Sequence, residues 1–274
     1  MARDAKTRKV PAKPEGETRR RVSGIDRAFQ ILDHLMERGT AARALDIARR
    51  IGAPTSTVYE IIDDLASRRV LTRDADGLVA LGPRLLHYGL AYRQATPFLI
   101  VAQREMQRLS ADIGESVQIC GRDDDMMVVL AMADGPGPFR VTSHVGTRVP
   151  LNWTASGRLL TGHLPDAERV ALYKRGARPS PTGRAETDAS RLAHASRQAL
   201  EEGLSIQLSE SDYAVACIAA PIVDPSGDCP ATISVVLSEL RAQAAPERYA
   251  GSVKAAARAI EAALGWDRET RPAA

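Results

Sequence analysis

ALDIARRIGAPTSTVYEIIDDLASRRVLTRDADGLVAL, residues 44–81, decides the fold of the N-terminal part of the chain. Its first part predicts a short amphipathic helix that ends at Gly52, and Pro54 with the two hydroxyl residues after it predicts the start of a second helix. Apolar residues of the second helix recur at i, i+3, i+4 and i+7 and form one stripe, Val58, Ile61, Ile62 and Leu65. Two short apolar runs follow, and the DADG turn between them predicts a β-hairpin. This order predicts a winged helix-turn-helix, which places its second helix in a DNA major groove.

Length and composition indicate a protein of two ordinary domains. The chain has 274 residues, of which 44% are hydrophobic and 26% charged, as in soluble globular proteins. No run of about 18 apolar residues is present, and the basic N-terminus lacks the apolar segment of a secretory signal. Cys120, Cys217 and Cys229 are odd in number and widely spaced, so we expect neither a disulfide framework nor a structural metal site. These features predict a cytoplasmic protein without a membrane span.

The first 22 residues predict a basic disordered tail. They hold eight basic and three acidic residues, hence a net charge of +5, whereas the whole chain carries only +3. Such a tail can run along DNA phosphates and add salt-dependent affinity. It can equally be a solvated extension without a function, because basic tails are common. The sequence leaves both interpretations open.

Helix-starting and helix-ending residues mark the boundaries around the winged helix. Ser23 is the expected N-cap of a first helix that ends at Gly39, and Pro83 and Pro97 each begin a further helix. We divide the chain into the tail 1–22, a winged helix-turn-helix domain 23–82, a linker helix 83–96, a larger domain 97–265 and a C-terminal tail 266–274.

From Glu115 onward the pattern changes from helical to extended. Short apolar runs separated by Gly, Pro and Asp predict strands, and periodic segments between them predict helices. The expected strands cover 116–120, 126–134, 138–145, 214–223 and 231–237, and the expected helices cover 155–164, 167–175, 190–202 and 246–264. Strands mixed with helices in this way predict an α+β domain with a central antiparallel sheet.

Five motifs follow one another along the chain. They are SGIDRAFQILDHL at 23–35, the helix-turn-helix segment 44–74, LGPRLLHYGL at 81–90, HVGTRVPLNWTASGRLLTGHL at 144–164 and CIAAPIVDPSGDCPATISV at 217–235. In order and spacing they resemble the IclR family of bacterial transcriptional regulators. The resemblance implies a winged helix-turn-helix joined by a helix to a GAF-like effector-binding domain. It also implies homodimers or homotetramers on palindromic double-stranded DNA operators, since each subunit presents one recognition helix to one half-site.

The outward face of the second helix departs from the family pattern. The resemblance implies a basic residue inside this helix and often a Lys near its start, whereas this chain has Glu60 and Thr55 there. Residues 23–92 carry nine arginines and nine acidic residues, so the domain is neutral. Hydroxyl groups can still bond phosphates or base edges, Glu60 can accept from cytosine N4, and arginines can contact phosphates. The predicted DNA-binding residues are Arg43, Thr55, Ser56, Thr57, Tyr59, Glu60, Arg68 and Arg73.

The resemblance also implies where a small-molecule effector binds. In the family, backbone amides at the start of a short helix hold a carboxylate, which suits an anion because free N–H groups converge there. The effector-binding positions here are Val141, Val149, Trp153, Ala155, Ser156, Gln207, Val215, Cys217, Ser234 and Val236. Gln207 replaces a typical acidic residue, and Val236 replaces a typical serine. We therefore expect a larger and more apolar ligand than a small hydrated acid, such as an aromatic or aliphatic carboxylate, with Trp153 near the mouth.

Other interpretations of the same residues predict other functions. The acidic face around Glu60 would suit a winged helix that contacts protein, and Cys217 would suit a cysteine-dependent enzyme. No nucleophile-and-base arrangement or phosphate loop is recognisable, so we expect no catalytic residues and no cofactor. His144 and His163 lack a second ligand at metal spacing, so we expect no metal. Each predicted effector residue can also serve packing alone.

Overall fold

The computed structural model describes residues 22–94, 96–137, 139 and 141–266, and the chain divides between Tyr92 and Arg93 into two compact units. This boundary falls within the expected linker helix 83–96. The expected tails 1–22 and 266–274 lie outside the described residues, apart from the single residue of each that adjoins the folded chain.

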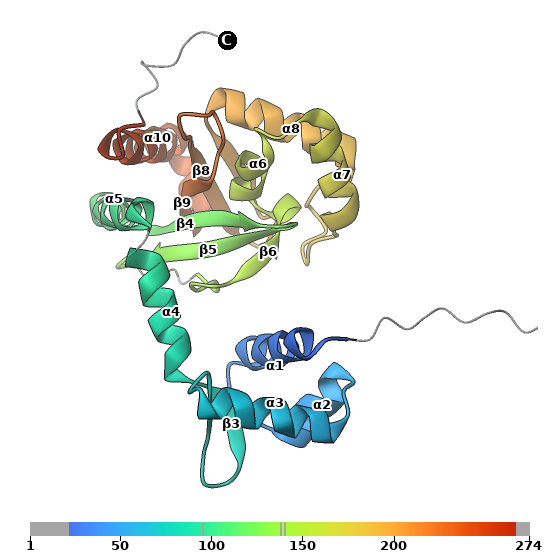
Figure 1. Cartoon of the computed structure of the whole chain (residues 1–274). Helices are drawn as coiled ribbons and strands as arrows, with labels where there is room; N and C mark the ends of the chain where they lie inside the picture. The colour runs from blue at the N-terminus through green and yellow to red at the C-terminus, as the bar shows by residue number, and fades with distance from the viewer. Residues whose placement is uncertain (1–21, 95, 138, 140, 267–274) are drawn as a thin grey trace, which may run out of the picture. The chain divides into compact units, whose positions relative to one another are not determined.

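Three helices and a small sheet make up the body of the N-terminal unit, and a fourth helix follows (Figure 1). In chain order they are α1 (Gly24–Arg38), β1 (Ala42–Arg43), α2 (Ala44–Ile51), α3 (Thr55–Ser67), β2 (Leu71–Arg73), β3 (Leu78–Leu81) and α4 (Pro83–Gln94). The antiparallel sheet has the order β1-β3-β2, so β2 and β3 form the expected hairpin. The predicted winged helix-turn-helix is confirmed. Strand β1 was not predicted, because two residues are too few to show a period.

The caps and the apolar stripe that the sequence predicts are present in this unit. Ser23 caps α1 in a capping box with Asp26, and Gly39 ends α1 in the left-handed region at φ 67°. Helices α1, α2 and α3 share a core with β3, built from Ile31, Leu35, Ile47, Val58, Ile62 and Val79. Burial of each such side chain contributes about 1.5–3 kcal/mol of stability. The core therefore fixes the position of α3 and, with it, the orientation of its exposed face.

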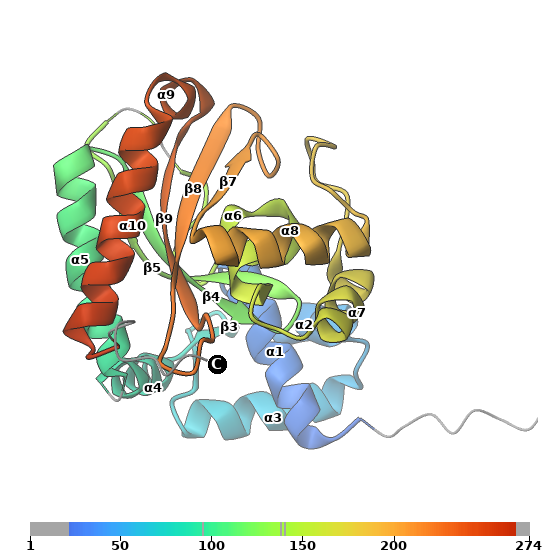
Figure 2. The same cartoon turned by 90° about the horizontal axis from the view of Figure 1, so that it is seen from above.

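The C-terminal unit is a six-stranded antiparallel sheet with helices on both faces (Figure 2). Its elements are α5 (Pro97–Ile113), β4 (Ser116–Asp123), β5 (Met126–Ala133), β6 (Arg148–Pro150), the 3-10 turn η1 (Leu151–Trp153), α6 (Ala155–Thr161), α7 (Asp166–Gly176), α8 (Ala189–Glu202), β7 (Ser205–Leu208), β8 (Val215–Ile222), β9 (Ala231–Ser238), α9 (Glu239–Ala244) and α10 (Pro246–Ala263). The strand order is β6-β5-β4-β9-β8-β7. This confirms the predicted α+β domain with a central antiparallel sheet.

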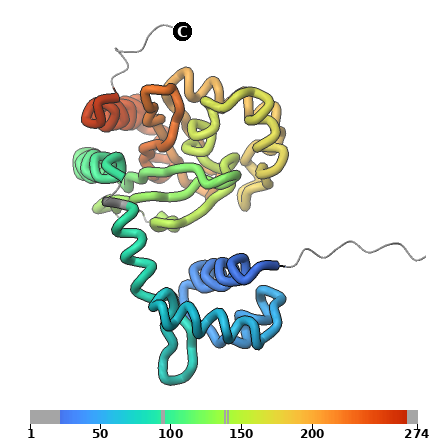
Figure 3. The backbone as a smooth tube through the Cα atoms, viewed as in Figure 1, coloured from blue at the N-terminus to red at the C-terminus, as the bar shows by residue number. Residues whose placement is uncertain are grey.

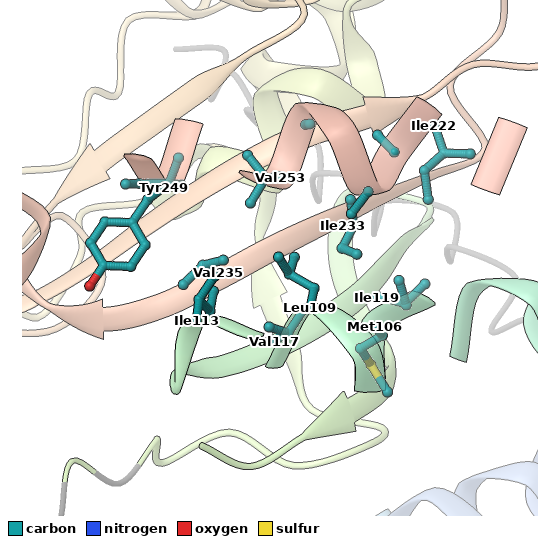
Figure 4. Packing of buried hydrophobic residues seen from close by; sticks show 14 of the residues in the cluster. Met106, Leu109, Ile113, Val117, Ile119, Ile222, Ile233, Val235, Tyr249 and Val253 are labelled. Atoms are coloured by element: carbon teal, nitrogen blue, oxygen red, sulfur yellow. The ribbon is translucent and has the colours of Figure 1, made fainter. Parts of the chain in front are cut away.

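Strand alternation divides the interior of this unit between the two faces of the sheet. Helices α5 and α10 lie side by side on one face although they come from opposite ends of the unit (Figures 2 and 3). They cover Val117 and Ile119 of β4 with Ile233 and Val235 of β9, as Figure 4 shows. Gln118 and Ser234, which lie between these residues on their strands, point to the other face, where α6 packs. That second face carries the candidate site.

One strand predicted for this unit is wrong, and several short elements were not predicted. Residues 141–145 contain no strand, although a strand over 138–145 was expected, because β5 pairs instead with the later residues Arg148–Pro150. The expected-strand segment leaves the sheet and contributes to a cavity on the second face. Strand β7 and helix α9 were not predicted, since four and six residues give too little periodicity to recognise.

Candidate effector cavity and DNA-binding surface

A cavity of about 310 Å³ lies between the sheet and α6 in the C-terminal unit. Eight of the ten predicted effector residues line it: Val141, Val149, Ser156, Gln207, Val215, Cys217, Ser234 and Val236. Trp153 and Ala155 do not. The indole N–H of Trp153 instead donates to the carbonyl of Arg178 at 2.8 Å, and the Ala155 side chain is fully buried. Trp153, which we expected near the mouth, therefore does not contribute to the cavity lining.

The register of the sheet brings residues of four strands together on the cavity floor. Cys217 of β8 pairs with Gln207 of β7 and with Val236 of β9, while Ser234 of β9 pairs with Gln118 of β4. Directly paired residues point to the same face of a sheet. Side chains from distant parts of the sequence thus line the same cavity.

Nine further residues that were not predicted also line the cavity. They are Gln118, Cys120, Met127, Thr142, Ser143, Thr154, Ser211, Asp212 and Tyr213. Alternation along the predicted strand 116–120 could have found Gln118 and Cys120, since they share one face of it. Ser211–Tyr213 follow a strand that was not predicted, and Thr142 and Ser143 lie in the segment wrongly assigned to a strand.

Two buried hydroxyl groups in the cavity are left without a firm hydrogen bond. The Oγ atoms of Ser156 and Ser234 have no hydrogen-bond partner within the described residues, beyond weak approaches of the Cys120 and Cys217 thiols. Gln118, in contrast, donates to Ser143 Oγ at 2.7 Å. The cavity floor therefore offers two hydroxyls that remain available to a ligand.

The loop between β7 and β8 is fixed at the cavity by several side chains. Arg158 of α6 donates to the carbonyl of Ile206 at 3.0 Å and forms an ion pair with Glu210. Thr182 donates to the Glu210 carbonyl at 2.7 Å, and Gln207 accepts from the Glu210 N–H at 2.8 Å. Because Ser211–Tyr213 follow directly, these contacts position the cavity wall.

The residues that line the cavity carry almost no charge. Asp212, at the exposed end, is the only charged residue in its described lining. Burial raises the pKa of Cys120 to about 11 and that of Cys217 to about 12, so both thiols are neutral at pH 7. The cavity floor consequently combines neutral thiols, hydroxyls and apolar groups.

Neutral buried thiols should react slowly with alkylating agents, whereas the nucleophilic cysteine of an enzyme should react fast. The alkylation rate therefore distinguishes a binding cavity from a cysteine-dependent active site. We expect alkylation of Cys120 and Cys217 by iodoacetamide at pH 7.5 to be about a hundredfold or more slower than that of an exposed cysteine, because the thiolate is the nucleophile. Mass spectrometry of the alkylated protein over time measures this. Rapid modification of Cys217 would favour the enzyme interpretation.

The predicted DNA-binding residues lie mainly on the exposed face of α3 and on the hairpin. Thr55, Ser56, Tyr59 and Glu60 are exposed, and Thr57 is half-buried. Arg43 is exposed at the start of α2, and Arg68 is exposed at the end of α3. The guanidinium of Arg73 is engaged within the unit, since it pairs with Asp63 at 2.8 Å and lies 6.0 Å from the centre of the Tyr59 ring.

The described part of the chain holds neither a candidate metal site nor a candidate membrane span. No group of three or more His, Cys, Asp or Glu residues is arranged to hold a metal ion there. No helix among the same residues has both the length and the apolar character needed to cross a membrane.

Comparison with known proteins gives consistent similarities along most of the chain. The family model described as bacterial transcriptional regulator IclR C-terminal matches residues 90–262, and the IclR helix-turn-helix domain matches residues 24–75. The chain is 25% identical over 266 residues to the HTH-type transcriptional repressor AllR of Escherichia coli K12, covering 96% of this chain and 97% of that protein.

Solved structures of similar proteins share the fold. An IclR homolog from Microbacterium hydrocarbonoxydans, complexed with 4-hydroxybenzoate, is 25% identical with a TM-score of 0.79, covering 89% of this chain and 100% of that chain. A transcriptional regulator from Alicyclobacillus acidocaldarius has a TM-score of 0.78 at 20% identity, covering 87% and 97% of the two chains.

Proposed function

This chain belongs to the IclR family of bacterial transcriptional regulators, and we propose that it is a ligand-responsive regulator without catalytic activity. Its winged helix-turn-helix binds a palindromic operator as part of a homodimer or homotetramer, in the cytoplasm where the DNA lies. Its cavity binds a small organic acid with an aromatic or aliphatic body. Effector binding changes operator affinity through a coupling of about 1–3 kcal/mol.

The observation that carries this proposal is the pair of buried, unsatisfied hydroxyls. Ser156 is 1% exposed and Ser234 is 0% exposed, and both line the cavity. An unsatisfied buried polar group costs about 1–3 kcal/mol, which a ligand oxygen recovers when it bonds to the group. A complex of a related protein with 4-hydroxybenzoate supports an aromatic acid as the kind of ligand.

The lining restricts how an acid binds. No Lys or Arg belongs to the described lining, so the carboxylate depends on hydroxyls and on backbone N–H groups at the start of α6. Thr154 caps that helix by accepting from the Gly157 N–H at 2.9 Å, and Thr154 and Ser156 both face the cavity. Met127 and the valines supply apolar walls for the body of the ligand.

Titration calorimetry on the full chain tests the ligand class. We expect 4-hydroxybenzoate or a related aromatic acid to bind more tightly than glyoxylate or pyruvate, because the walls are apolar and two family-typical polar residues are replaced. Tight binding of the small acids without binding of aromatic acids would contradict the proposed class.

Gel shifts with the DNA that flanks the gene of this protein, measured across a salt series, test the DNA-binding half of the proposal. We expect a shift at low salt that weakens as salt rises, because phosphate contacts release counterions. Absence of any shift at low salt would favour a winged helix that contacts protein instead.

Replacing Glu60 with Arg tests how α3 contacts DNA. We expect Glu60→Arg to tighten non-specific DNA binding by about tenfold, because an exposed carboxylate on α3 is replaced by a guanidinium that attracts phosphates. Fluorescence anisotropy with DNA of random sequence measures this, with Glu37→Arg on α1 as the control for the same charge change. A fall in operator affinity for Glu60→Arg alone would show that Glu60 reads a base.

A further inference from the structure

A hollow of about 200 Å³ lies in the N-terminal unit, where the end of α3 meets the start of α4. Arg68, Arg69, Arg84 and His87 line it, and we call it the arginine hollow. All four residues are exposed and none belongs to the core of the unit. Burial in the core therefore does not explain why three arginines and a histidine gather there, although Arg84 also lies 5.5 Å from the centre of the Tyr88 ring.

The backbone fixes the arginines in this arrangement. Arg69 adopts a left-handed conformation at φ 60°, which costs a non-glycine residue free energy. Gly82 lies so close to it that a Cβ at Gly82 would be 2.4 Å from the Arg69 carbonyl oxygen. The Arg84 N–H donates to that oxygen at 3.1 Å, and the Arg84 guanidinium donates to the Arg68 carbonyl at 3.3 Å. These contacts hold the start of α4 against the end of α3.

The charge of the hollow is not neutralised within the described part of the protein. No ion pair found there includes Arg68, Arg69, Arg84 or His87, whereas nearby Arg73 pairs with Asp63 at 2.8 Å. Three guanidinium groups that share one hollow repel one another, and an anion between them replaces this repulsion with attraction. The hollow is therefore positively charged, as an anion-binding site is, and none of the described acidic side chains pairs with its arginines.

We propose that the arginine hollow binds a phosphate group, supplied either by the DNA backbone or by free phosphate. The guanidinium fork matches the oxygens of a phosphate and stays charged at every physiological pH. Arg68 and Arg69 directly follow α3 and precede the hairpin, so the hollow adjoins the end of the helix that enters the major groove in a helix-turn-helix. The DNA source rests on the function proposed above, whereas the free-phosphate source does not.

Inorganic phosphate tests the site independently of DNA. We expect the ³¹P resonance of inorganic phosphate to broaden on addition of the full chain at constant ionic strength, and the double variant Arg69→Gln/Arg84→Gln to abolish most of this broadening. The control Arg38→Gln/Arg248→Gln removes the same charge from exposed positions outside the hollow and should broaden the resonance like the wild type. Circular dichroism melts check that every variant folds.

A salt series with DNA identifies the source of the phosphate. If the hollow holds a backbone phosphate, the slope of log affinity against log salt falls by about 0.9 for each DNA phosphate that the hollow variant no longer neutralises, and the control keeps the wild-type slope. Arg84→Lys keeps the charge and should retain the slope. Phosphate broadening with an unchanged slope identifies free phosphate as the source.

Three results separate the failure of this inference from the failure of the proposed function. No broadening and an unchanged slope overturn the arginine hollow as a phosphate site, as does a change confined to oligomeric state by analytical ultracentrifugation. Phosphate broadening together with no DNA binding at low salt overturns the proposed function and leaves the site intact.

Discussion

Replacing Ser156 with Ala and Ser234 with Val should lower effector affinity by about 10- to 100-fold while leaving the unliganded protein at least as stable. Both hydroxyls are buried in the cavity without a firm partner, so their removal relieves a desolvation cost in the free protein. The bound ligand, however, loses two buried hydrogen bonds, and each tenfold loss corresponds to about 1.4 kcal/mol. Opposite signs for stability and binding distinguish a ligand-binding role from a structural one.

Calorimetry with the acid that binds the wild type and thermal unfolding of the free protein measure the two effects. Thr232→Val is the matched control, since Thr232 on β9 is also fully buried with an unpartnered hydroxyl but does not line the cavity. It should leave affinity unchanged. Equal affinity of the wild type and the double variant would contradict a role for these hydroxyls in binding.

Replacing Arg158 with Met should destabilise the C-terminal unit by about 2–4 kcal/mol and weaken effector binding as well. The side chains of Arg158 and Glu210 are only 12% and 19% exposed, so loss of the guanidinium leaves a largely buried carboxylate without its partner. The same change removes a hydrogen bond to the Ile206 carbonyl. Because Ser211 and Tyr213 follow Glu210 closely in the chain, we expect the cavity wall to loosen together with the fold.

Urea unfolding and calorimetry measure both effects. The second change Glu210→Gln in the Arg158→Met background should restore part of the stability, because it removes the unpaired charge. Arg197→Met is the control, since its pair with Glu201 is 63% exposed on both sides and should contribute little to stability. A similar loss of stability for Arg197→Met would argue against burial as the cause.

The cavity shows which parts of the site were readable from sequence. The motif around Ser156 and that around Ser234 carried the family pattern, and both residues line the cavity. Trp153 does not line the cavity, because its indole N–H donates to the carbonyl of Arg178, which is distant in the sequence. The orientation of a side chain next to a binding motif depends on the hydrogen-bond partners that the tertiary structure places near it.

Apart from the strand expected over 138–145, the short strands β1, β6 and β7 and helix α9, the helices and strands of both units follow from the sequence. Local signals suffice for that, because a capping residue such as Ser23, a glycine such as Gly39 and the stripe of α3 act within a few residues. The tertiary structure, in contrast, determines which residues come into contact with one another. Gln118, Ser211 and Tyr213 reach the cavity, and Arg68, Arg69 and Arg84 converge, only because strand pairing and chain reversal bring together backbone segments that are separate in the sequence. Register and loop conformation depend on these non-local contacts, and local periodicity does not encode them.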